Sequence, residues 1–474
     1  MSGPLRPGTR LPGAGQALTI VLAAGQGTRM KSRKPKVLHP LAGKPMLEYV
    51  LEVAAKVSSN VVVVIGHGAE EIRGAIKQAN VNWVVQEKQL GTAHATLQAG
   101  PFFEEHRGPV LVLSGDVPLL KEETVRRLLN AHEDSGTRIS FLSAQVEDPT
   151  GYGRIVRGAG GGVLRIVEEN DATPDEKALA EINAGIYCFE GRGLATLLSS
   201  IPCNDAKGEY YLTEAVSLVL ASGGTVQALE TDPVETLGIN SRLDLSQAEA
   251  LIRRRINQEH MRRGVTLLDP STTYIDVTVE IGQDTVLYPN TYLLGRTRLG
   301  EDCTILPGSL IVDSEVGQSV RIGAACVIEE ARIADRAMVG PFSHLRPESV
   351  LEEEVHVGNF VEVKKSTLGR GTKANHLSYI GDAIVGKGVN IGAGTITCNY
   401  DGISKHQTII EDDVFVGSDT QLVAPVTVGQ GSIIGAGTTL TKNVPPQALA
   451  LSRAPLVVKE SWAKRKLQKR ETTE

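Results

Sequence analysis

The first half of the chain alternates short apolar runs with stretches of helical periodicity. The apolar runs predict strands at 18–23, 60–65, 83–86, 110–114 and 139–144. Between these strands, apolar residues at helical spacing predict helices, among them 46–57 and 122–132. The alternation is typical of an α/β domain, which we expect at 18–241, with a mostly parallel sheet covered by helices. Ligands of such sheets bind at the carboxyl ends of the strands.

After Tyr274 the apolar pattern changes to a period of six residues. Aliphatic or small side chains recur at this spacing, with one-residue slips and one long break, at Ile275, Ile281, Leu287, Leu293, Leu299, Ile305, Ile311, Val316, Ile322, Ile328, Ile333, Val339, Leu345, Leu351, Val357, Val363, Leu368, Ala374, Ile380, Val385, Ile391, Thr397, Ile410, Val416, Leu422, Val428, Ile434 and Leu440. A helix repeats every 3.6 residues and a strand every 2, so neither explains this period. The pattern predicts a parallel β-helix of hexapeptide repeats over 264–454.

Two segments interrupt these regular patterns. The polar stretch 242–263 predicts a linker helix, and its run of three arginines at 253–255 is best explained as a solvated helix face. Within the repeats, the interval from Thr397 to Ile410 is one residue longer than two repeats and contains Cys398-Asn399-Tyr400-Asp401-Gly402. A polar, glycine-containing break in a solenoid predicts a protruding loop, and such loops commonly carry function.

Composition narrows the class of protein. The formal net charge of −6 argues against a nucleic-acid binder. Five cysteines without a C-x-x-C pair favour a reducing, cytoplasmic setting over a disulfide framework or a zinc site. Since no apolar run approaches the roughly 20 residues that span a bilayer, we expect no membrane partner. We expect a disordered extension at 1–17, rich in Gly and Pro, and a basic tail at 455–474.

Candidate chemistry in the first half lies at two strand ends. The first predicted strand runs into Ala23-Ala24-Gly25-Gln26-Gly27-Thr28-Arg29-Met30, a glycine-rich loop whose N–H groups can close on a phosphate or a base. It is neither a dinucleotide fingerprint nor a P-loop, and by itself it fits a tight turn equally well. Asp116 follows another apolar run and can hold Mg²⁺ against nucleotide phosphates, although a lone strand-end Asp is more often a cap.

In the second half, His344, His356 and His376 lie within the repeats. A lone histidine is more often structural than catalytic, yet His376 precedes the Thr397–Ile410 break by about one coil. An imidazole there can accept and release a proton near neutral pH.

The motifs resemble those of a known family. Leu22-Ala23-Ala24-Gly25-x-Gly27-Thr28-Arg29-Met30 with Pro35-Lys36 resembles the signature of sugar-1-phosphate nucleotidyltransferases, and Gly151-Tyr152-Gly153-Arg154, Val167-Glu168 and Glu181-Ile182-Asn183-Ala184-Gly185 continue it. Leu345-Arg346-Pro347, 358–365, His376 and 390–402 resemble acetyltransferase motifs. From about Thr19 to Trp462 the chain resembles the bifunctional N-acetylglucosamine-1-phosphate uridylyltransferase/glucosamine-1-phosphate N-acetyltransferase family. Ser114 departs from it, because the family usually has Tyr there.

The resemblance implies a fold and a function. The first domain would be Rossmann-like, the β-helix left-handed, and the protein a homotrimer through the β-helix. Glucosamine 1-phosphate would be N-acetylated by acetyl-CoA, and UTP with Mg²⁺ would then convert the product to UDP-N-acetylglucosamine and pyrophosphate, a precursor for cell-wall and lipopolysaccharide synthesis.

The resemblance also implies site residues. The UTP and UDP-sugar set is Leu22, Ala23, Ala24, Gly25, Arg29, Lys36, Gln86, Gly91, Thr92, Asp116, Gly153, Glu168, Asn183 and Asn240, with Asp116 and Asn240 as metal ligands. In the acetyltransferase, His376 would be the general base, and the sugar phosphate would meet Arg346, Lys364, Tyr379 and Asn390. Acetyl-CoA would meet Ala393, Asn399, Tyr400, Ser418, Ala436 and Arg453.

Two other functions remain compatible with the sequence. One is a single-activity sugar-1-phosphate nucleotidyltransferase whose β-helix is structural or regulatory, and the cluster of His376, Lys364 and Asn399-Tyr400 argues against it. The other is a non-enzymatic scaffold, which Lys36, Asp116 and Asn240 argue against.

Overall fold

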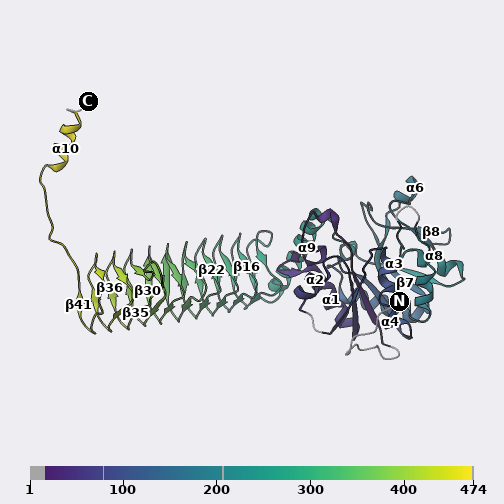
Figure 1. The fold of residues 1–474 in the computed structure, drawn as a ribbon, viewed down its shortest axis with the longest axis horizontal. Helices are drawn as coiled ribbons and strands as arrows, with labels where there is room; N and C mark the ends of the chain where they lie inside the picture. Colours follow the sequence, from purple (N-terminus) through teal and green to yellow (C-terminus); the bar gives the residue numbers. More distant parts are fainter. Residues whose placement is uncertain (1–15, 78–79, 205–207, 472–474) are drawn as a thin grey trace. The chain divides into compact units, whose positions relative to one another are not determined.

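The computed structural model describes residues 16–77, 80–204 and 208–471. The predicted disordered extension, apart from residues 16 and 17, lies outside the described residues. The chain divides into two compact units, Met1–Arg253 and Arg254–Glu474, and each is described by itself (Figure 1). The finer domain boundaries given above stay predictions.

The first unit is built on one twisted sheet. Its strands are β1 (Leu18–Ala23), β4 (Asn60–Ile65), β5 (Val81–Val85), β6 (Pro109–Ser114), β7 (Ile139–Gln145), β8 (Arg154–Arg157), β9 (Val163–Val167), β10 (Glu181–Glu190) and β11 (Val226–Glu230). Their order is β11-β7-β10-β6-β1-β4-β5, with β8 and β9 attached to β10. All pairs between β6, β1, β4 and β5 are parallel, whereas β10 runs antiparallel to both neighbours. The predicted mostly parallel sheet is therefore confirmed.

Helices and short pieces connect the strands of this sheet (Figure 1). They are η1 (Thr28–Met30), η2 (Lys36–Leu38), β2 (Pro40–Leu41), β3 (Lys44–Pro45), α1 (Met46–Val57), α2 (Ala69–Ala75), α3 (Thr92–Leu97), α4 (Gly100–Phe103), α5 (Glu122–Ser135), α6 (Pro174–Lys177), α7 (Leu194–Ser199), α8 (Glu214–Ala221) and η3 (Pro233–Thr236). The predicted bounds of β1, β4 and α1 agree with the structure. The helix predicted at 122–132 continues to Ser135, where Gly136 ends it with a left-handed φ of 60°.

The strand predicted at 83–86 is shifted in the structure. β5 begins at Val81, because Val81 and Asn82 pair with Val61 and Val62 of the buried strand β4. It ends at Val85, and the side chain of Gln86 is buried beyond the strand end. The local apolar pattern did not include Asn82, whose place in the strand depends on its neighbour across the sheet.

The carboxyl ends of β1 and β6 lie side by side. The two strands pair in parallel through Leu22 and Ser114, and the Gly115 N–H donates to the Leu22 carbonyl at 2.9 Å. The glycine-rich loop after β1 and Asp116 after β6 therefore start from the same edge of the sheet.

The predicted linker helix is α9 (Arg242–Arg262), which ends one residue before the expected 263. Asp244 in its first turn accepts hydrogen bonds from the backbone N–H groups of Asn240 and Ser241, at 2.9 and 2.8 Å. Such a carboxylate satisfies N–H groups that have no partner within the helix. The contact also holds Asn240 at the start of α9.

The second unit is a stack of coils with three parallel sheets, which we call faces one, two and three (Figure 1). Face one contains β12 (Thr266–Leu267), β15 (Val286–Leu287), β18 (Thr304–Ile305), β21 (Arg321–Ile322), β24 (Met338–Val339), β27 (His356–Asn359), β30 (Lys373–His376), β33 (Asn390–Ile391), β36 (Phe415–Val416), β39 (Ile433–Ile434) and β41 (Leu449–Ala450). Face two contains β13 (Tyr274–Ile275), β16 (Tyr292–Leu294), β19 (Leu310–Val312), β22 (Val327–Glu329), β25 (His344–Leu345), β28 (Glu362–Lys364), β31 (Tyr379–Gly381), β34 (Ile396–Cys398), β37 (Gln421–Val423) and β40 (Thr439–Leu440). Face three contains β14 (Glu280–Ile281), β17 (Arg298–Leu299), β20 (Glu315–Val316), β23 (Arg332–Ile333), β26 (Val350–Leu351), β29 (Thr367–Leu368), β32 (Ala383–Val385), β35 (Thr408–Ile410) and β38 (Val426–Val428). The predicted β-helix is confirmed.

The period of six arises from one inward side chain per face. Every residue in the six-residue series is buried except Ile281, which is half-buried against the same core. Ile275 pairs with Leu293, a coil of 18 residues, whereas Leu299 pairs with Val316, a coil of 17. A slip in the sequence is thus a corner shortened by one residue, and the aliphatic ladder inside the coil continues unbroken.

The predicted protruding loop separates β34 from β35. Ala383 pairs with Thr408, a separation of 25 residues where neighbouring coils have 17 or 18. An antiparallel bridge between Tyr400 and Lys405 closes the loop, and Ile403 at its tip is 91% exposed.

The basic tail contains a helix that was not predicted, α10 (Trp462–Glu471). Lys459 Nζ lies 5.2 Å from the centroid of the Trp462 ring, where a cation and an aromatic face attract each other. The segment lacks an apolar stripe, so its periodicity carried no helical signal. Among the helices in the described ranges, none has the length and apolar character needed to cross a bilayer.

Candidate active sites

Three residues far apart in sequence meet at the edge of the first sheet. Lys36 Nζ lies 2.5 Å from Asp116 Oδ2 and 3.1 Å from Asn240 Oδ1. The side chains of Lys36 and Asp116 are only 12% and 23% exposed. The Asp116 carbonyl also accepts the Ile239 N–H at 2.9 Å, which brings the segment before α9 to the end of β6. The predicted Lys36, Asp116 and Asn240 are therefore brought together.

The donor atoms of this cluster suit a hard divalent cation. One carboxylate oxygen and one amide oxygen approach a single cationic atom, the Lys36 ammonium. Mg²⁺ is commonly held by one or two protein oxygens, with substrate phosphates and water completing its shell. No group of three or more His, Cys, Asp or Glu side chains with metal-binding geometry occurs in the described part of the chain. Asp116 and Asn240 fit Mg²⁺ as two protein ligands.

The residues expected around the base and ribose line the same edge. Ala23 and Ala24 are buried, Leu22 is half-buried, and Gly25 is exposed. Gly91 has a φ of 96°, and a Cβ there would lie 2.5 Å from the Tyr210 carbonyl oxygen, so only glycine fits. Thr92 Oγ1 accepts the Leu212 N–H at 2.9 Å, and Gln86 is buried.

The residues expected to hold the sugar are fixed by buried neighbours. The Thr213 hydroxyl donates to Glu168 Oε1 at 2.9 Å, and Asn183 Nδ2 donates to the Tyr187 hydroxyl at 2.7 Å. The Asn183 N–H donates to the Gly153 carbonyl at 2.8 Å. Burial raises the pKa of Tyr187. Tyr187 and Thr213 therefore orient predicted site residues, and the sequence did not single them out as such.

Arg29 and Ser114 also belong to the first unit. Arg29 lies exposed in η1, and its phosphate contact stays a prediction. The Ser114 hydroxyl donates to the Gly185 carbonyl at 3.2 Å.

In the second unit, His376 ends strand β30 and is exposed. Its Nδ1 lies 3.0 Å from Oδ1 of Asn359, the residue that pairs with it on β27. An amide oxygen only accepts, so Nδ1 carries the proton and Nε2 keeps its lone pair. Nε2 is therefore the atom that can act as a base. Asn359 was part of a quoted motif but was not predicted to be functional.

His376 belongs to a row of residues along one corner of the β-helix. In successive coils Ala374 pairs with Ile391, Ile391 with Val416, and Val416 with Ile434. The residues two positions after each of these therefore stack on one another at one corner. This corner row, in order, is Asn359, His376, Ala393, Ser418 and Ala436. A Cβ on Gly435 would lie 3.8 Å from an Arg453 side-chain nitrogen, so Arg453 reaches the same corner. Three of the predicted acetyl-CoA residues thus follow His376 along this row, and Arg453 approaches its far end.

A cationic cluster lies on face two. Arg346 pairs with Glu362 at 2.8 Å, and Lys364 with Asp382 at 3.5 Å. Lys405 of the protruding loop lies beside Lys364, and the close side-chain contact together with the Lys364 charge lowers the pKa of Lys405. Two ammonium groups held together form a site for an anion. Lys405 was not predicted, because only the folded loop brings it to Lys364.

The loop is anchored to this cluster. Asn399 Nδ2 donates to Asp382 Oδ2 at 2.5 Å and to the Tyr379 hydroxyl at 3.4 Å. Asp401 accepts from the backbone N–H groups of Ser404 and Ile403 and lies 2.6 Å from His406 Nε2, and these contacts lower its pKa. Tyr400 is 61% exposed on the loop.

Not all predicted acetyltransferase residues meet within one chain. Asn390 lies on face one, whereas Arg346, Lys364 and Tyr379 belong to face two. Over residues 16–77, 80–204 and 208–471, no hydrogen bond joins the Asn390 side chain to that cluster.

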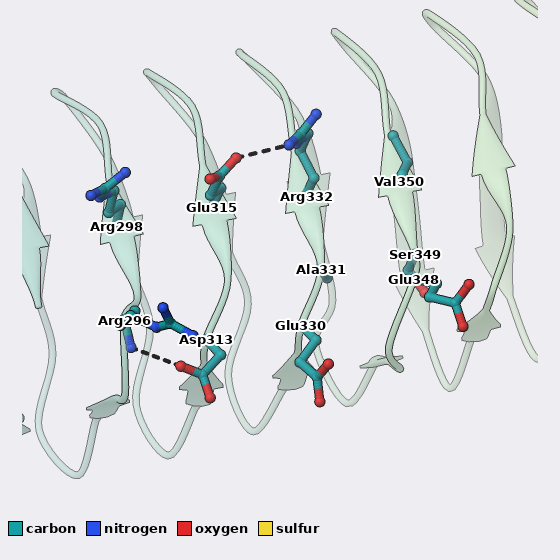
Figure 2. A pocket seen from close by; sticks show the side chains of 10 residues that line it. All are labelled: Arg296, Arg298, Asp313, Glu315, Glu330, Ala331, Arg332, Glu348, Ser349 and Val350. Atoms are coloured by element: carbon teal, nitrogen blue, oxygen red, sulfur yellow. Dashed lines mark hydrogen bonds and ion pairs between the residues drawn. The ribbon is translucent and has the colours of Figure 1, made fainter. Parts of the chain in front are cut away.

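An open concavity of about 570 Å³ lies on face three, and no predicted site residue lines it. Figure 2 shows its lining residues, Arg296, Arg298, Asp313, Glu315, Glu330, Ala331, Arg332, Glu348, Ser349 and Val350. Arg332 pairs with Glu315 at 3.2 Å, and Asp313 accepts the Arg296 N–H at 2.8 Å. These charges are partly satisfied by one another, and no reactive group is set apart.

The fold and the two clusters define a nucleotidyltransferase joined to a hexapeptide-repeat transferase. Residues 19–186 match the MobA-like NTP transferase domain, and residues 407–442 match the bacterial transferase hexapeptide with six repeats. The chain is 47% identical over 448 residues to the bifunctional protein GlmU of Shouchella clausii, covering 94% of this chain and 98% of the relative. It is 50% identical over 451 residues to the bifunctional protein GlmU of Thermotoga petrophila, with coverage of 94% and 98%. A third relative, the bifunctional protein GlmU of Geobacter sulfurreducens, is 48% identical over 467 residues, with coverage of 94% and 98%.

The chain belongs to the family of bifunctional GlmU proteins. It is a bifunctional enzyme that combines a uridylyltransferase in the α/β unit with an N-acetyltransferase on a left-handed β-helix of hexapeptide repeats. The alternatives of a single-activity enzyme and of a scaffold are thereby excluded.

Proposed function

We propose that the two sites act one after the other on one amino sugar phosphate. The acetyltransferase converts glucosamine 1-phosphate and acetyl-CoA to N-acetylglucosamine 1-phosphate. The uridylyltransferase then joins this product to UTP with Mg²⁺, giving UDP-N-acetylglucosamine and pyrophosphate. The meeting of Lys36, Asp116 and Asn240 carries the proposal for the second reaction, and the His376–Asn359 contact carries it for the first.

In uridylyl transfer, a phosphate oxygen of the sugar phosphate forms a bond to the α-phosphorus of UTP. The bond from that phosphorus to the leaving pyrophosphate breaks. The nucleophile is already anionic, so positioning and charge neutralisation supply most of the catalysis. Lys36 neutralises phosphate charge, and Asp116 and Asn240 hold Mg²⁺, which when bound offsets the charge of the phosphates. Glu168 and Asn183 orient the sugar, and their side chains are themselves held by hydrogen bonds with Thr213 and Tyr187.

In acetyl transfer, the amine of glucosamine 1-phosphate attacks the thioester carbonyl of acetyl-CoA. His376 Nε2 takes the proton that the amine loses as the C–N bond forms. The C–S bond then breaks, and the departing sulfur takes this proton from His376 Nε2 to leave as CoA thiol. Asn359 keeps the proton on Nδ1 and thereby keeps Nε2 available. Direct transfer needs no covalent enzyme intermediate, and burial raises the pKa of Cys398, which disfavours a thiolate nucleophile.

Arg346, Lys364 and Lys405 bind the phosphate of the acetyl acceptor in this proposal. Phosphate binding stabilises the charged form of Lys405 in particular, because a phosphate dianion offsets the repulsion from Lys364 that lowers the pKa of Lys405. The corner row from Ala393 to Ala436 and Arg453 binds acetyl-CoA, which places the thioester next to His376.

The separation of Asn390 on face one from the cluster on face two supports a site completed by a second copy of the chain. A homotrimer through the β-helix, as the resemblance implies, brings face one of one copy to face two of another. Five free cysteines, of which Cys188, Cys303 and Cys326 are buried, support a cytoplasmic location.

The two activities allow a reciprocal test in one polypeptide. We expect His376→Ala to abolish acetyl transfer and to spare uridylyl transfer, and Asp116→Asn to do the reverse. Acetyl-CoA consumption and pyrophosphate release would be measured separately, with each substrate omitted in turn. Each variant is the folding control for the other site. Undiminished acetyl transfer by His376→Ala, or undiminished uridylyl transfer by Asp116→Asn, contradicts the corresponding assignment.

A further inference from the structure

A buried amide at the nucleotide edge is held in one orientation. The side chain of Gln86 is 2% exposed, and its Nε2 lies 3.2 Å from the Gly91 carbonyl oxygen and 2.9 Å from His94 Nδ1. An amide nitrogen can only donate, so both hydrogens of Nε2 are used. In the described ranges of the chain, no hydrogen bond to Gln86 Oε1 is found, and this oxygen is left for a ligand.

The contact defines the tautomer of His94, which lies on helix α3. Gln98 Nε2 is 3.2 Å from His94 Nε2, but a neutral ring carries one proton, and its two nitrogens cannot both accept. The buried Gln86 decides between them, because a reversed amide would set its oxygen against the Gly91 carbonyl. Gln98 Nε2 also donates to the His94 carbonyl at 3.1 Å, but Gln98 is only half-buried, and its side chain can exchange both contacts for water. His94 Nδ1 therefore accepts, and Nε2 carries the proton.

The charge state of the ring agrees with this arrangement. Burial lowers the pKa of His94, which keeps the ring neutral at neutral pH. A protonated ring has no acceptor, and it would lose its contact with Gln86 Nε2.

We propose that His94 is a positioning residue for base selection, which holds the Gln86 amide so that Oε1 faces the imino N–H of a uracil ring. This inference rests on the proposed placement of the UTP base beside Gln86. Uracil presents an N3–H donor, which pairs with the Gln86 oxygen. Cytosine presents a bare N3 acceptor at the same position, and two acceptors facing each other leave a desolvated polar pair unmatched. A freely rotating amide would serve both bases.

The test compares UTP with CTP as substrates of the full chain. Pyrophosphate release would be measured for wild type, His94→Phe, His94→Asn and Gln86→Ala, with N-acetylglucosamine 1-phosphate and Mg²⁺ present. We expect His94→Phe to lower the ratio of kcat/KM for UTP to that for CTP by about three- to tenfold, the range for one neutral hydrogen bond. His94→Asn, whose amide oxygen can accept in place of Nδ1, should restore most of the ratio. Acetyl transfer by the same polypeptide reports on folding.

The outcomes separate this inference from the proposed function. If Gln86→Ala changes the UTP-to-CTP ratio but His94→Phe does not, the positioning role is wrong and the base placement stands. An equal loss for both nucleotides in His94→Phe, with the ratio unchanged, means that His94 is only structural. An unchanged ratio in Gln86→Ala contradicts the base placement itself and the inference with it.

Discussion

The contact between Asn359 and His376 leads to a quantitative prediction for acetyl transfer. Asn359→Leu keeps a side chain of similar size but removes the acceptor that lies 3.0 Å from His376 Nδ1. When Nε2 takes a proton from the amine, the ring becomes an imidazolium, and its Nδ1–H forms a charge-assisted hydrogen bond. Such bonds contribute about 1.5–3 kcal/mol, against about 0.5–1.5 kcal/mol for a neutral one. The amide oxygen therefore stabilises the transition state more than the ground state.

The expected loss follows from that difference. His376 is exposed, so water replaces part of the contact, and we take the low end, about 1 kcal/mol. This corresponds to a roughly fivefold lower kcat for acetyl transfer. His376→Ala removes the base altogether and should cost about 10²- to 10⁴-fold. We expect Asn359→Asp to retain more activity than Asn359→Leu, because its carboxylate can accept the same hydrogen.

The assay is steady-state release of CoA thiol with saturating glucosamine 1-phosphate and acetyl-CoA. His356→Asn is the matched control, since His356 lies on the same strand β27 and pairs with Lys373 at the far end of β30 from His376. Uridylyl transfer should be unchanged in every variant. An Asn359→Leu enzyme with wild-type kcat would refute the role of Asn359, and so would an equal loss in both activities.

Three further predictions concern the loop, the metal and the core. The pKa of Asp401 is depressed in the folded protein, so its contribution to loop stability is complete above the unfolded value of about 3.9 and is lost only as pH falls through the lower folded value. Asp401→Asn should therefore raise the KM for acetyl-CoA throughout pH 5.5–8. A change in KM confined to the acid end of this range would contradict the prediction. EDTA should abolish uridylyl transfer, excess Mg²⁺ should restore it, and acetyl transfer should persist throughout. Leu293→Ala, at a fully buried position of the β-helix, should lower the free energy of unfolding by about 2–5 kcal/mol in denaturant titrations, whereas Leu243→Ala, at a position 77% exposed, should change it little.

Elements with a strong local pattern could be predicted from the sequence. Strands β1 and β4 and helix α1 were predicted with their observed bounds, because each buries a continuous or periodic apolar surface. The β-helix followed from its repeat, since one inward side chain per face imposes a period of six on any sequence that folds this way. β5 was misplaced because its first residues depend on pairing with β4. α10 was missed because its sequence has no apolar stripe.

The residues of the candidate sites were also predicted only in part from the sequence. Motif resemblance named His376 and Lys364, but it did not single out Asn359 and Lys405, which orient or complete them. Lys405 is separated from Lys364 by two coils of the β-helix and part of the protruding loop, and no local pattern links the two lysines.

The sequence by itself determined the change from an α/β unit to a β-helix, the place of the protruding loop, and the family whose motifs the chain carries. These are properties of residues close together along the chain, where burial periodicity and short motifs are visible without a structure. Only the tertiary structure decided that Lys36, Asp116 and Asn240 meet, that Asn359 sets the tautomer of His376, and that His94 holds Gln86. Hydrogen bonds act over about 3 Å of space, whatever the separation along the chain. The chemistry of both sites therefore depends on contacts that appear only when the strands are paired.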